Sequence, residues 1–230
     1  MDAYVKWMPS TNNDGLTDCR NLAVNGNTAQ KALLRTIVPA WQCPTRARTG
    51  QEMFTAVDVP GGTSQDGRYG ACGDYAVCYG TTDNPRLSDG AFTVQWDYPG
   101  LAFSKFTDGL SHTIMAGEKH LPRLHKCGMN NDTGVAYAYS ATNGIRWDNT
   151  IYAALGSGGW FTSCRAADAN GLAQGPMDTS MDSHYFGSWH NAVCPMLMSD
   201  GAVVVMSNNI AGSVFQAMGT RAGGEADTSY

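Results

Sequence analysis

Two short apolar runs near the C-terminus give the clearest pattern in the chain. Val193–Met198 and Ala202–Met206 flank the polar triplet Ser199-Asp200-Gly201. Asp-Gly between apolar runs is typical of a β-hairpin, because a type I′ turn needs positive φ at both central residues. The pattern therefore predicts a hairpin with Asp200 and Gly201 at the centre of its turn, so that Ser199 faces the first residue of the second run.

Two segments have the apolar spacing of short helices. A helix is expected over Thr28–Val38, and Pro39 ends it because proline cannot continue a helix. A second is expected near Ser213–Met218, with Ser213 as the N-cap and Gly219 at the C′ position.

Runs rich in β-branched and aromatic residues predict strands in the first half of the chain. These runs are Tyr69–Tyr79, Ala91–Trp96 and Thr113–Ala116, the last of which follows a tight turn at Asp108-Gly109. Together with the C-terminal hairpin they indicate an antiparallel sheet.

Residues 120–185 show no sustained periodicity and are rich in Gly, Asn and aromatic residues, with strand candidates at Val135–Tyr139 and Gly159–Phe161. We interpret them as a loop-rich insertion in a single α+β domain over residues 1–230. The expected segments are a loop or extended stretch (1–26), a first half with helix and sheet (27–119), the insertion (120–185) and the hairpin with its helix (186–230).

Composition favours a surface protein over a nucleic-acid-binding or membrane protein. Only 15% of residues are charged, against about 25% in ordinary soluble domains, and there are 27 glycines. The net charge of -5 and the lack of any Lys/Arg cluster argue against nucleic acid. No run approaches the ~20 apolar residues of a membrane span, so no membrane contact is expected from this chain as given.

Seven cysteines are many for a reduced cytosolic domain, and none form a CxxC pair. The count predicts at least two disulfides in an oxidising compartment, and thus an extracellular, cell-surface or periplasmic protein. Cys72 and Cys78 are candidates to close a local loop, and Cys127 and Cys164 bracket the insertion. Cys194, inside an apolar strand, is expected to be a buried thiol.

The chain contains no standard catalytic motif: no Gly-x-Ser-x-Gly, Walker loop, dinucleotide fingerprint or HExxH. His184 and His190 with Asp182 suit no standard zinc spacing. We interpret His190 as structural, donating to a backbone carbonyl at the hairpin base opposite Ala211. It would then lie roughly 30 Å from Asp200 at about 3.3 Å per residue, so the two cannot form a catalytic pair.

Several blocks of the sequence resemble one family. His190, followed after nine residues by Asp200-Gly201, is similar to the C-terminal signature of the planctomycete-type pseudopilin-like proteins. FTDGLSHTIMAGEK (residues 106–119), with Asp108, Gly109 and Glu118, resembles the family's central strand. WQCPT (41–45) and GTRAGGE (219–225) are also family-like, so the resemblance runs from about residue 30 to the end of the chain.

The resemblance implies the globular head of a pilin-like protein with short helices on an antiparallel sheet. Family members begin with an apolar prepilin helix that packs with its counterparts in a fibre core, and this chain contains no such helix. The implied partners are other pilin-like subunits, joined through that missing helix. The head alone is expected to be a monomer or weak dimer with small, polar contacts below ~1,200 Å².

Calcium is the one cofactor that the resemblance brings in, because some pseudopilins use it to order a β-loop. The oxygen-rich candidates are Asn130 with Asp132, and Asp178 with Asp182. Calcium takes six to eight oxygen ligands, partly from backbone carbonyls. The alternative is that these residues are solvated turn residues making local hydrogen bonds.

Three functions follow from these observations. The first is a non-enzymatic structural subunit of a surface fibre or a type II secretion-like apparatus. The second is a module that binds an extracellular solute, glycan or other polymer through exposed aromatic residues such as Trp147, Tyr152 and Trp160. The third, a secreted hydrolase, lacks a visible nucleophile and base.

Overall fold

The structure is a computed structural model. It describes residues 36–46, 53–54, 70–71, 73–81, 88–92, 101–123, 164–179 and 185–224. The chain divides into two compact units. The first comprises residues 1–73 and 124–162, and the second comprises residues 74–123 and 163–230.

The described part of the first unit consists of short pieces. Two 3₁₀ turns cover Pro39–Trp41 and Pro44–Arg46. A two-residue strand, β1 (Met53–Phe54), pairs antiparallel with β2 (Gly70–Ala71).

The predicted helix over Thr28–Val38 is wrong at its C-terminal end, and residues 28–35 lie outside the described residues. Residues 36–38 are not helical, and Val38 is extended with φ −106° and ψ 104°. The residue before a proline is disfavoured in the α region, because the proline ring clashes with it. Pro39 therefore begins a 3₁₀ turn rather than following a helix.

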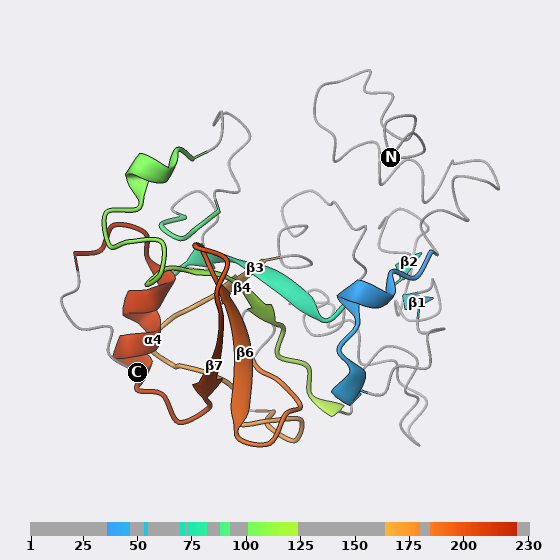
Figure 1. Ribbon diagram of the computed structural model, residues 1–230. Helices are drawn as coiled ribbons and strands as arrows, with labels where there is room; N and C mark the ends of the chain where they lie inside the picture. Colours follow the sequence, from blue (N-terminus) through green and yellow to red (C-terminus); the bar gives the residue numbers. More distant parts are fainter. Residues whose placement is uncertain are drawn as a thin grey trace, which may run out of the picture. The chain divides into compact units, whose positions relative to one another are not determined.

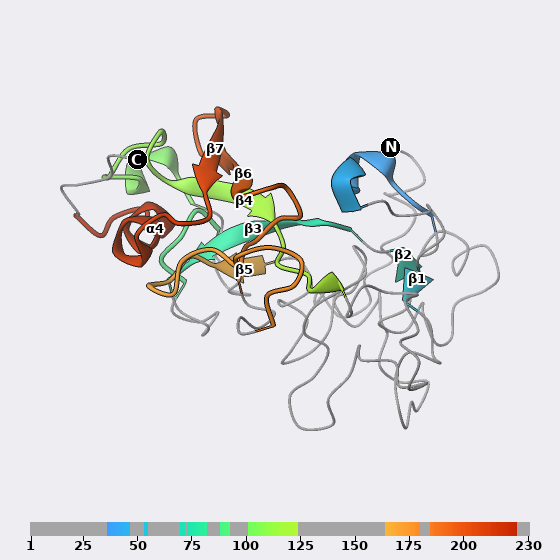
Figure 2. The same ribbon diagram turned by 90° about the horizontal axis from the view of Figure 1, so that it is seen from below.

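The second unit is built on a mixed sheet, so the α+β class is confirmed (Figure 1). Its described strands are β3 (Tyr75–Gly80), β4 (Ile114–Glu118), β5 (Cys164–Ala166), β6 (Val193–Met198) and β7 (Val203–Ser207). They lie in the order β5-β3-β4-β6-β7, which can be followed in Figure 2. The β3–β4, β4–β6 and β6–β7 pairs are antiparallel, whereas β5 joins β3 in parallel.

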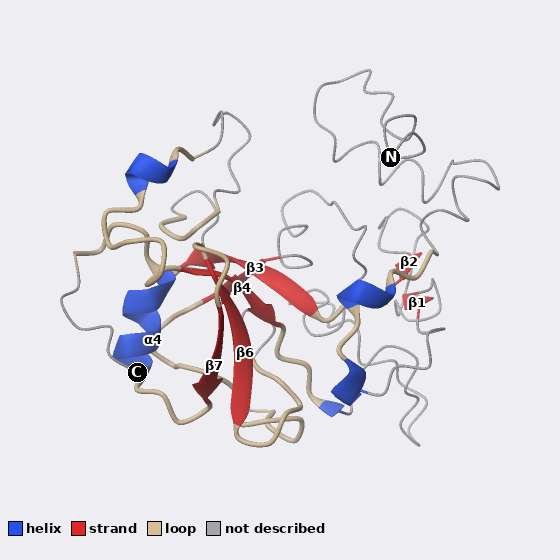
Figure 3. Cartoon of the chain, viewed as in Figure 1, coloured by secondary structure: helices blue, strands red, loops and turns tan. Residues whose placement is uncertain are grey.

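One face of this sheet packs on a single described helix, α4 (Gly212–Gly219), which Figure 3 draws beside the strands. Phe215 of α4 meets Phe186 edge to face, with ring centroids 6.4 Å apart. Such edge-to-face pairs add to the hydrophobic gain from burying the two rings. The buried core comprises Ala76, Cys78, Ile114, Ala167, Leu172, Phe186, Cys194, Met196, Met198, Met206, Phe215 and Met218.

The C-terminal hairpin forms as predicted, but its turn differs. Met198 N–H donates to the carbonyl of Ala202 at 2.8 Å, and Gly201 N–H donates to the carbonyl of Met198 at 3.0 Å. The loop therefore has three residues, Ser199, Asp200 and Gly201, of which only Gly201 has positive φ (+92°). This is a type I turn followed by a left-handed glycine, the usual three-residue hairpin loop.

The predicted two-residue type I′ turn is thus wrong, and the register is shifted by one residue. Asp200 Oδ1 accepts the N–H of Ala202 at 2.9 Å. That bond is available to an aspartate in the right-handed region, so the loop needs a glycine at one position rather than two. Met198, not Ser199, faces Ala202.

Helix α4 is present where the apolar spacing predicts it, but both predicted caps are wrong. Its N-cap is Ala211, which makes no side-chain hydrogen bond, and its C-cap is Thr220. Gly219 is the last helical residue instead of a left-handed C′ residue. A Cβ at Gly219 would lie 2.6 Å from the Cβ of Ala167. Glycine is therefore needed there for close packing.

The remaining strand predictions are partly confirmed. Tyr69–Tyr79 is divided between β2 and β3, and β4 lies over the predicted Thr113–Ala116 strand. The first two residues of the predicted Ala91–Trp96 strand are not in a strand, and residues 93–96 lie outside the described residues. The candidates Val135–Tyr139 and Gly159–Phe161 also lie outside them.

Gly201→Val is expected to destabilise the second unit by about 1 kcal/mol or more, because a β-branched residue resists positive φ. A Cβ at Gly201 would meet nothing within 4 Å, so the loss is conformational rather than steric. Denaturant unfolding measures it. Gly201→Asn is the matched control, and it should lose less because asparagine tolerates the left-handed region. Equal losses in the two variants would contradict this explanation.

Candidate functional site

The loop before β4 is organised by the carboxylate of Asp108. Gly109, at φ +96°, closes a turn in which its N–H donates to the carbonyl of Phe106 at 3.2 Å. Beside it, the Asp108 carboxylate accepts the N–H groups of Gly223 at 2.7 Å and Gly224 at 3.1 Å. It also accepts the Thr220 hydroxyl at 3.4 Å. One side chain therefore holds the segment 219–224, which is more than 100 residues away in sequence.

Arg221 links the same C-terminal segment to a second loop, residues 88–90, through hydrogen bonds. Its guanidinium Nη1 donates to the carbonyls of Ser88 at 3.1 Å and Gly90 at 2.8 Å. Its backbone N–H donates to the carbonyl of Asp89 at 3.0 Å. In turn its carbonyl accepts the N–H of Asp108 at 3.3 Å. Arg221 thus joins the 88–90 loop to the loop before β4.

The hairpin loop contacts the loop before β4 through backbone hydrogen bonds. Ser199 N–H donates to the carbonyl of Thr113 at 2.9 Å, and Asp200 N–H donates to that of Leu110 at 3.2 Å. The Asp108-Gly109 and Asp200-Gly201 motifs are therefore neighbours in space. We call the contacts among residues 106–113, 199–200 and 219–224 the β4-start junction.

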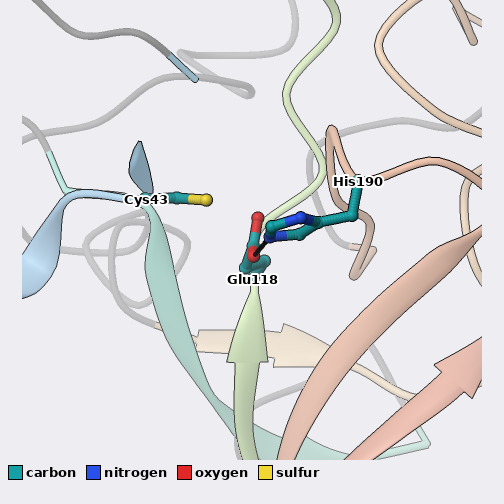
Figure 4. Close-up of side chains that lie close together, drawn as sticks. All are labelled: Cys43, Glu118 and His190. Atoms are coloured by element: carbon teal, nitrogen blue, oxygen red, sulfur yellow. Dashed lines mark ion pairs between the residues drawn. The ribbon is translucent and has the colours of Figure 1, made fainter. Parts of the chain in front are cut away.

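At the other end of β4, Glu118 and His190 form an ion pair. His190 Nε2 lies 3.0 Å from Glu118 Oε1 (Figure 4). The Glu118 side chain is 1% exposed and the His190 side chain 33% exposed. A buried carboxylate loses its hydration, and this cost is offset only if the group is paired. Cys43, which Figure 4 also labels, belongs to the first unit.

The loop that carries His190 is held around the end of β4. Gly187 N–H donates to the carbonyl of Glu118 at 3.0 Å, and Trp189 Nε1 donates to the carbonyl of Leu121 at 2.7 Å. Ser188 Oγ donates to the carbonyl of Val193 and accepts the N–H of His190 at 3.1 Å. We call this set, with Glu118, the β4-end junction.

Pro195 explains why β4 changes partner at this point. The β4–β6 register places Gly117 opposite Met196, so the next residue of β4 comes opposite Pro195. Proline has no N–H to donate to a neighbouring strand. The ladder between β4 and β6 therefore stops, and the Glu118 carbonyl is satisfied by Gly187 instead. The chain between Phe186 and β6 therefore passes around the end of β4 and brings His190 to Glu118.

His190 thus differs from its prediction. We expected it to donate to a backbone carbonyl at the hairpin base opposite Ala211, whereas its Nε2 faces a carboxylate on another strand. Strand pairing between β6 and β7 begins at Val193 with Ser207 and does not include His190. Sequence spacing within the hairpin carries no information about a partner on β4, which is why the pair was missed.

Of the calcium candidates, only Asp178 lies among the described residues; Asn130, Asp132 and Asp182 lie outside them, as does His184. Asp178 Oδ2 accepts the N–H of Gln174 at 2.9 Å, and its backbone carbonyl lies 2.9 Å from His120 Nε2. The Gln174 contact is local, whereas the His120 contact joins segments 58 residues apart in sequence.

The disulfide prediction is corrected for one pair. Cys78 is buried and forms no disulfide, so the predicted Cys72–Cys78 bridge is wrong. The described strand β3 carries Cys78 into the core below α4, where its Sγ lies 3.9 Å from the carbonyl of Gly219. Cys194 is a buried thiol, as predicted, and no disulfide forms among the described residues. Cys72 and Cys127 lie outside them, and so does the side chain of Cys164.

A shallow apolar cavity of about 320 Å³ lies beside the β4-start junction. Phe103 is 73% exposed, and its ring centroid is 6.3 Å from that of Phe106. Ser199 contributes a hydroxyl with no hydrogen-bond partner among the described residues. The cavity is lined by Ala91, Phe92, Leu101, Phe103, Phe106, Met115 and Ser199. Such a surface suits an apolar ligand better than a sugar, which needs several polar partners.

The sequence pattern marked most of the junction residues but not their connections. Asp108, Gly109, Glu118, His190 and Asp200 all lie at one of the two junctions, and Gly201 follows Asp200 in the hairpin loop. Thr220, Arg221 and Ser188 were not singled out, although Arg221 lies inside the family-like GTRAGGE block. The arginine in this glycine-rich block was the available signal, because a guanidinium has several N–H donors and can bond several backbone carbonyls at once.

Comparison with known proteins shows the family. The family model named SBP_bac_10, described as "Protein of unknown function (DUF1559)", matches residues 5–213. The chain therefore belongs to this family. No curated protein matches it, and neither does any solved structure. No described helix is long and apolar enough to span a membrane.

Asp108→Asn is expected to destabilise the second unit by about 1–2 kcal/mol, because the amide offers one acceptor oxygen where the carboxylate offers two. Cleavage by trypsin after Arg221 should become faster. Denaturant unfolding and limited proteolysis measure the two effects. Asp200→Asn is the matched control: Asp200 is exposed, and its change should stay within about 0.5 kcal/mol. Similar effects from both variants would contradict the role given to Asp108.

Glu118→Gln and His190→Gln are expected to be coupled. A double-mutant cycle on unfolding should give an interaction free energy of about 1 kcal/mol or more, because either change removes the same ion pair. The control cycle combines Glu118→Gln with His112→Gln. His112 is exposed and contacts the carbonyl of Asp108 near the start of β4, so this cycle should be additive. A coupling no larger than that of the control would show that the pair contributes nothing.

Proposed function

We propose that this chain is the globular head of a pseudopilin-like structural subunit at the bacterial cell surface, and that it is not an enzyme. The observation that supports this most is the use made of the signature residues. Glu118 is 1% exposed and paired with His190, while the Asp108 carboxylate accepts two backbone N–H groups and a hydroxyl. These side chains therefore stabilise the fold, because their ion pair and hydrogen bonds join segments of the same chain.

Catalysis would require a different arrangement. A general base or nucleophile must reach a substrate atom within hydrogen-bond distance, and a carboxylate with 1% exposure does not meet a solute. At the two junctions, the described acidic side chains instead contact groups of the chain itself. The proposal extends to assembly: the partners are other pilin-like subunits, joined through the apolar N-terminal helix that the resemblance implies.

The proposal is tested in the native host with an antibody raised against this chain. The antigen should be accessible to protease added to intact cells. Deleting the prepilin peptidase should raise the mass of the antigen and abolish its surface exposure, because the resemblance implies that the peptidase processes the N-terminus. A cytosolic antigen, or one whose mass does not depend on the peptidase, would overturn the proposal.

A solute-binding module is the second candidate function, and the cavity at Phe103 favours it. Its lining side chains are mostly apolar, and the Ser199 hydroxyl is buried, so the solute class it fits is apolar or aromatic. The aromatic residues first considered for binding, Trp147, Tyr152 and Trp160, lie outside the described residues.

A further inference from the structure

The last strand of the described sheet has an open edge. Among the strands that the structure describes, β7 pairs with β6 alone. Its Val204 and Met206 side chains face the core, whereas Val203 and Val205 are 68% and 61% exposed. Two exposed valines side by side on a sheet edge present apolar surface to solvent at the same place as unsatisfied backbone groups.

The register of the hairpin fixes which backbone groups those are. Met198 N–H bonds to the carbonyl of Ala202, and Asn208 N–H bonds to that of Ala192. Hydrogen-bonded pairs alternate in an antiparallel ladder, so the even-numbered residues of β7 point their N–H and C=O groups at β6. Val203, Val205 and Ser207 then point theirs at the open edge.

Pro195 agrees with this assignment. It lies opposite Val205, and its own backbone groups face β4, where its missing N–H ends the ladder. The N–H and C=O of Val205 are therefore directed away from β6. The Ser207 carbonyl already accepts the N–H of Ile210 at 3.0 Å, which leaves its N–H as the outward donor.

Edge strands in soluble proteins are normally protected by charge, proline, a bulge or a cover. The sequence of β7, Val-Val-Val-Met-Ser, contains no charged residue and no proline. Its pairing with β6 runs over five consecutive residue pairs without a bulge. This edge has none of the intrinsic devices that prevent strand addition.

We propose that the β7 edge docks a second copy of this chain, antiparallel, about a twofold axis at Val205. Val205 then exchanges both hydrogen bonds with its counterpart, and Ser207 N–H donates to the Val203 carbonyl of the second copy. The Val205 side chains lie opposite each other, and Val203 faces Ser207. Twofold pairing uses the same surface on both subunits, so an uncharged edge carries no self-repulsion.

The size of the surface sets the strength of this contact. Five residues of strand at about 3.4 Å each give a strip of roughly 17 Å, and strip contacts of this kind fall below the ~1,200 Å² of stable complexes. The dimer is therefore weak and forms at high local concentration. Its surface is apolar, unlike the polar contacts expected from the sequence. The inference does not depend on the proposed function.

Amide hydrogen exchange, followed residue by residue by NMR from micromolar to millimolar protein, tests the proposal. In the monomer the amides of Val204 and Met206 are protected by β6, and those of Val203, Val205 and Ser207 exchange fast. As concentration rises, protection should appear at these three and stay unchanged at the other two. A dimer that forms without this alternating gain docks elsewhere, and a chain that stays monomeric has no such contact; either result overturns the proposal.

Matched variants give a second measurement by sedimentation. Val205→Lys places two like charges opposite each other at the axis and should weaken the dimer by about tenfold or more. Val205→Thr keeps β-propensity without charge and should weaken it far less. Met177→Lys is the control, because Met177 is 70% exposed and belongs to no strand of the sheet; it should leave dimerisation unchanged. Equal effects of the two lysine variants would overturn the proposal.

Discussion

The pairing of β4 with β6, closed at both ends, is the constraint on which the rest of the described unit depends. At the start of β4, the Asp108 loop holds the hairpin loop and the C-terminal segment. At its end, Glu118 holds the loop of His190. The two motifs have equal length, since ten positions separate Asp108 from Glu118 and ten separate His190 from Asp200. This match is not a strand register, because Glu118 comes opposite Pro195 and the chain before β6 turns back to bring His190 to it.

The two junctions are held by different chemistry. The β4-start junction rests mainly on backbone N–H groups that donate to a carboxylate, with the Thr220 hydroxyl as a third donor. The β4-end junction uses two side chains, one of them buried, and either residue alone would leave the other without this partner. The first ties together segments that are distant in sequence, and the second closes the place where Pro195 ends the ladder. The Glu118 carboxylate is buried, and the Asp108 carboxylate accepts three hydrogen bonds from the chain itself.

The sequence pattern predicted local structure better than connections. The hairpin, α4 and β4 are each visible in a short window of apolar periodicity. The turn type was mistaken because Asp-Gly fits both a two-residue and a three-residue loop, and the bond from Ala202 to the Asp200 side chain decides between them. Gly219 was mistaken for a helix cap because its close approach to Ala167 depends on a segment some 50 residues earlier. The Glu118–His190 pair depends on strand order, which no single window contains.

The order of strands in the sheet also governs when the unit can be completed during synthesis. β3 and β4 are made first and lie in the middle, while β5, β6 and β7 are made after residue 163 and flank them on both sides. The hydrogen bonds to the Asp108 carboxylate need residues 220–224, which are made after every strand of the described sheet. A nascent chain therefore keeps the β3 edge of this central strand pair open until β5 has been made, and the β4 edge open until β6 has been made.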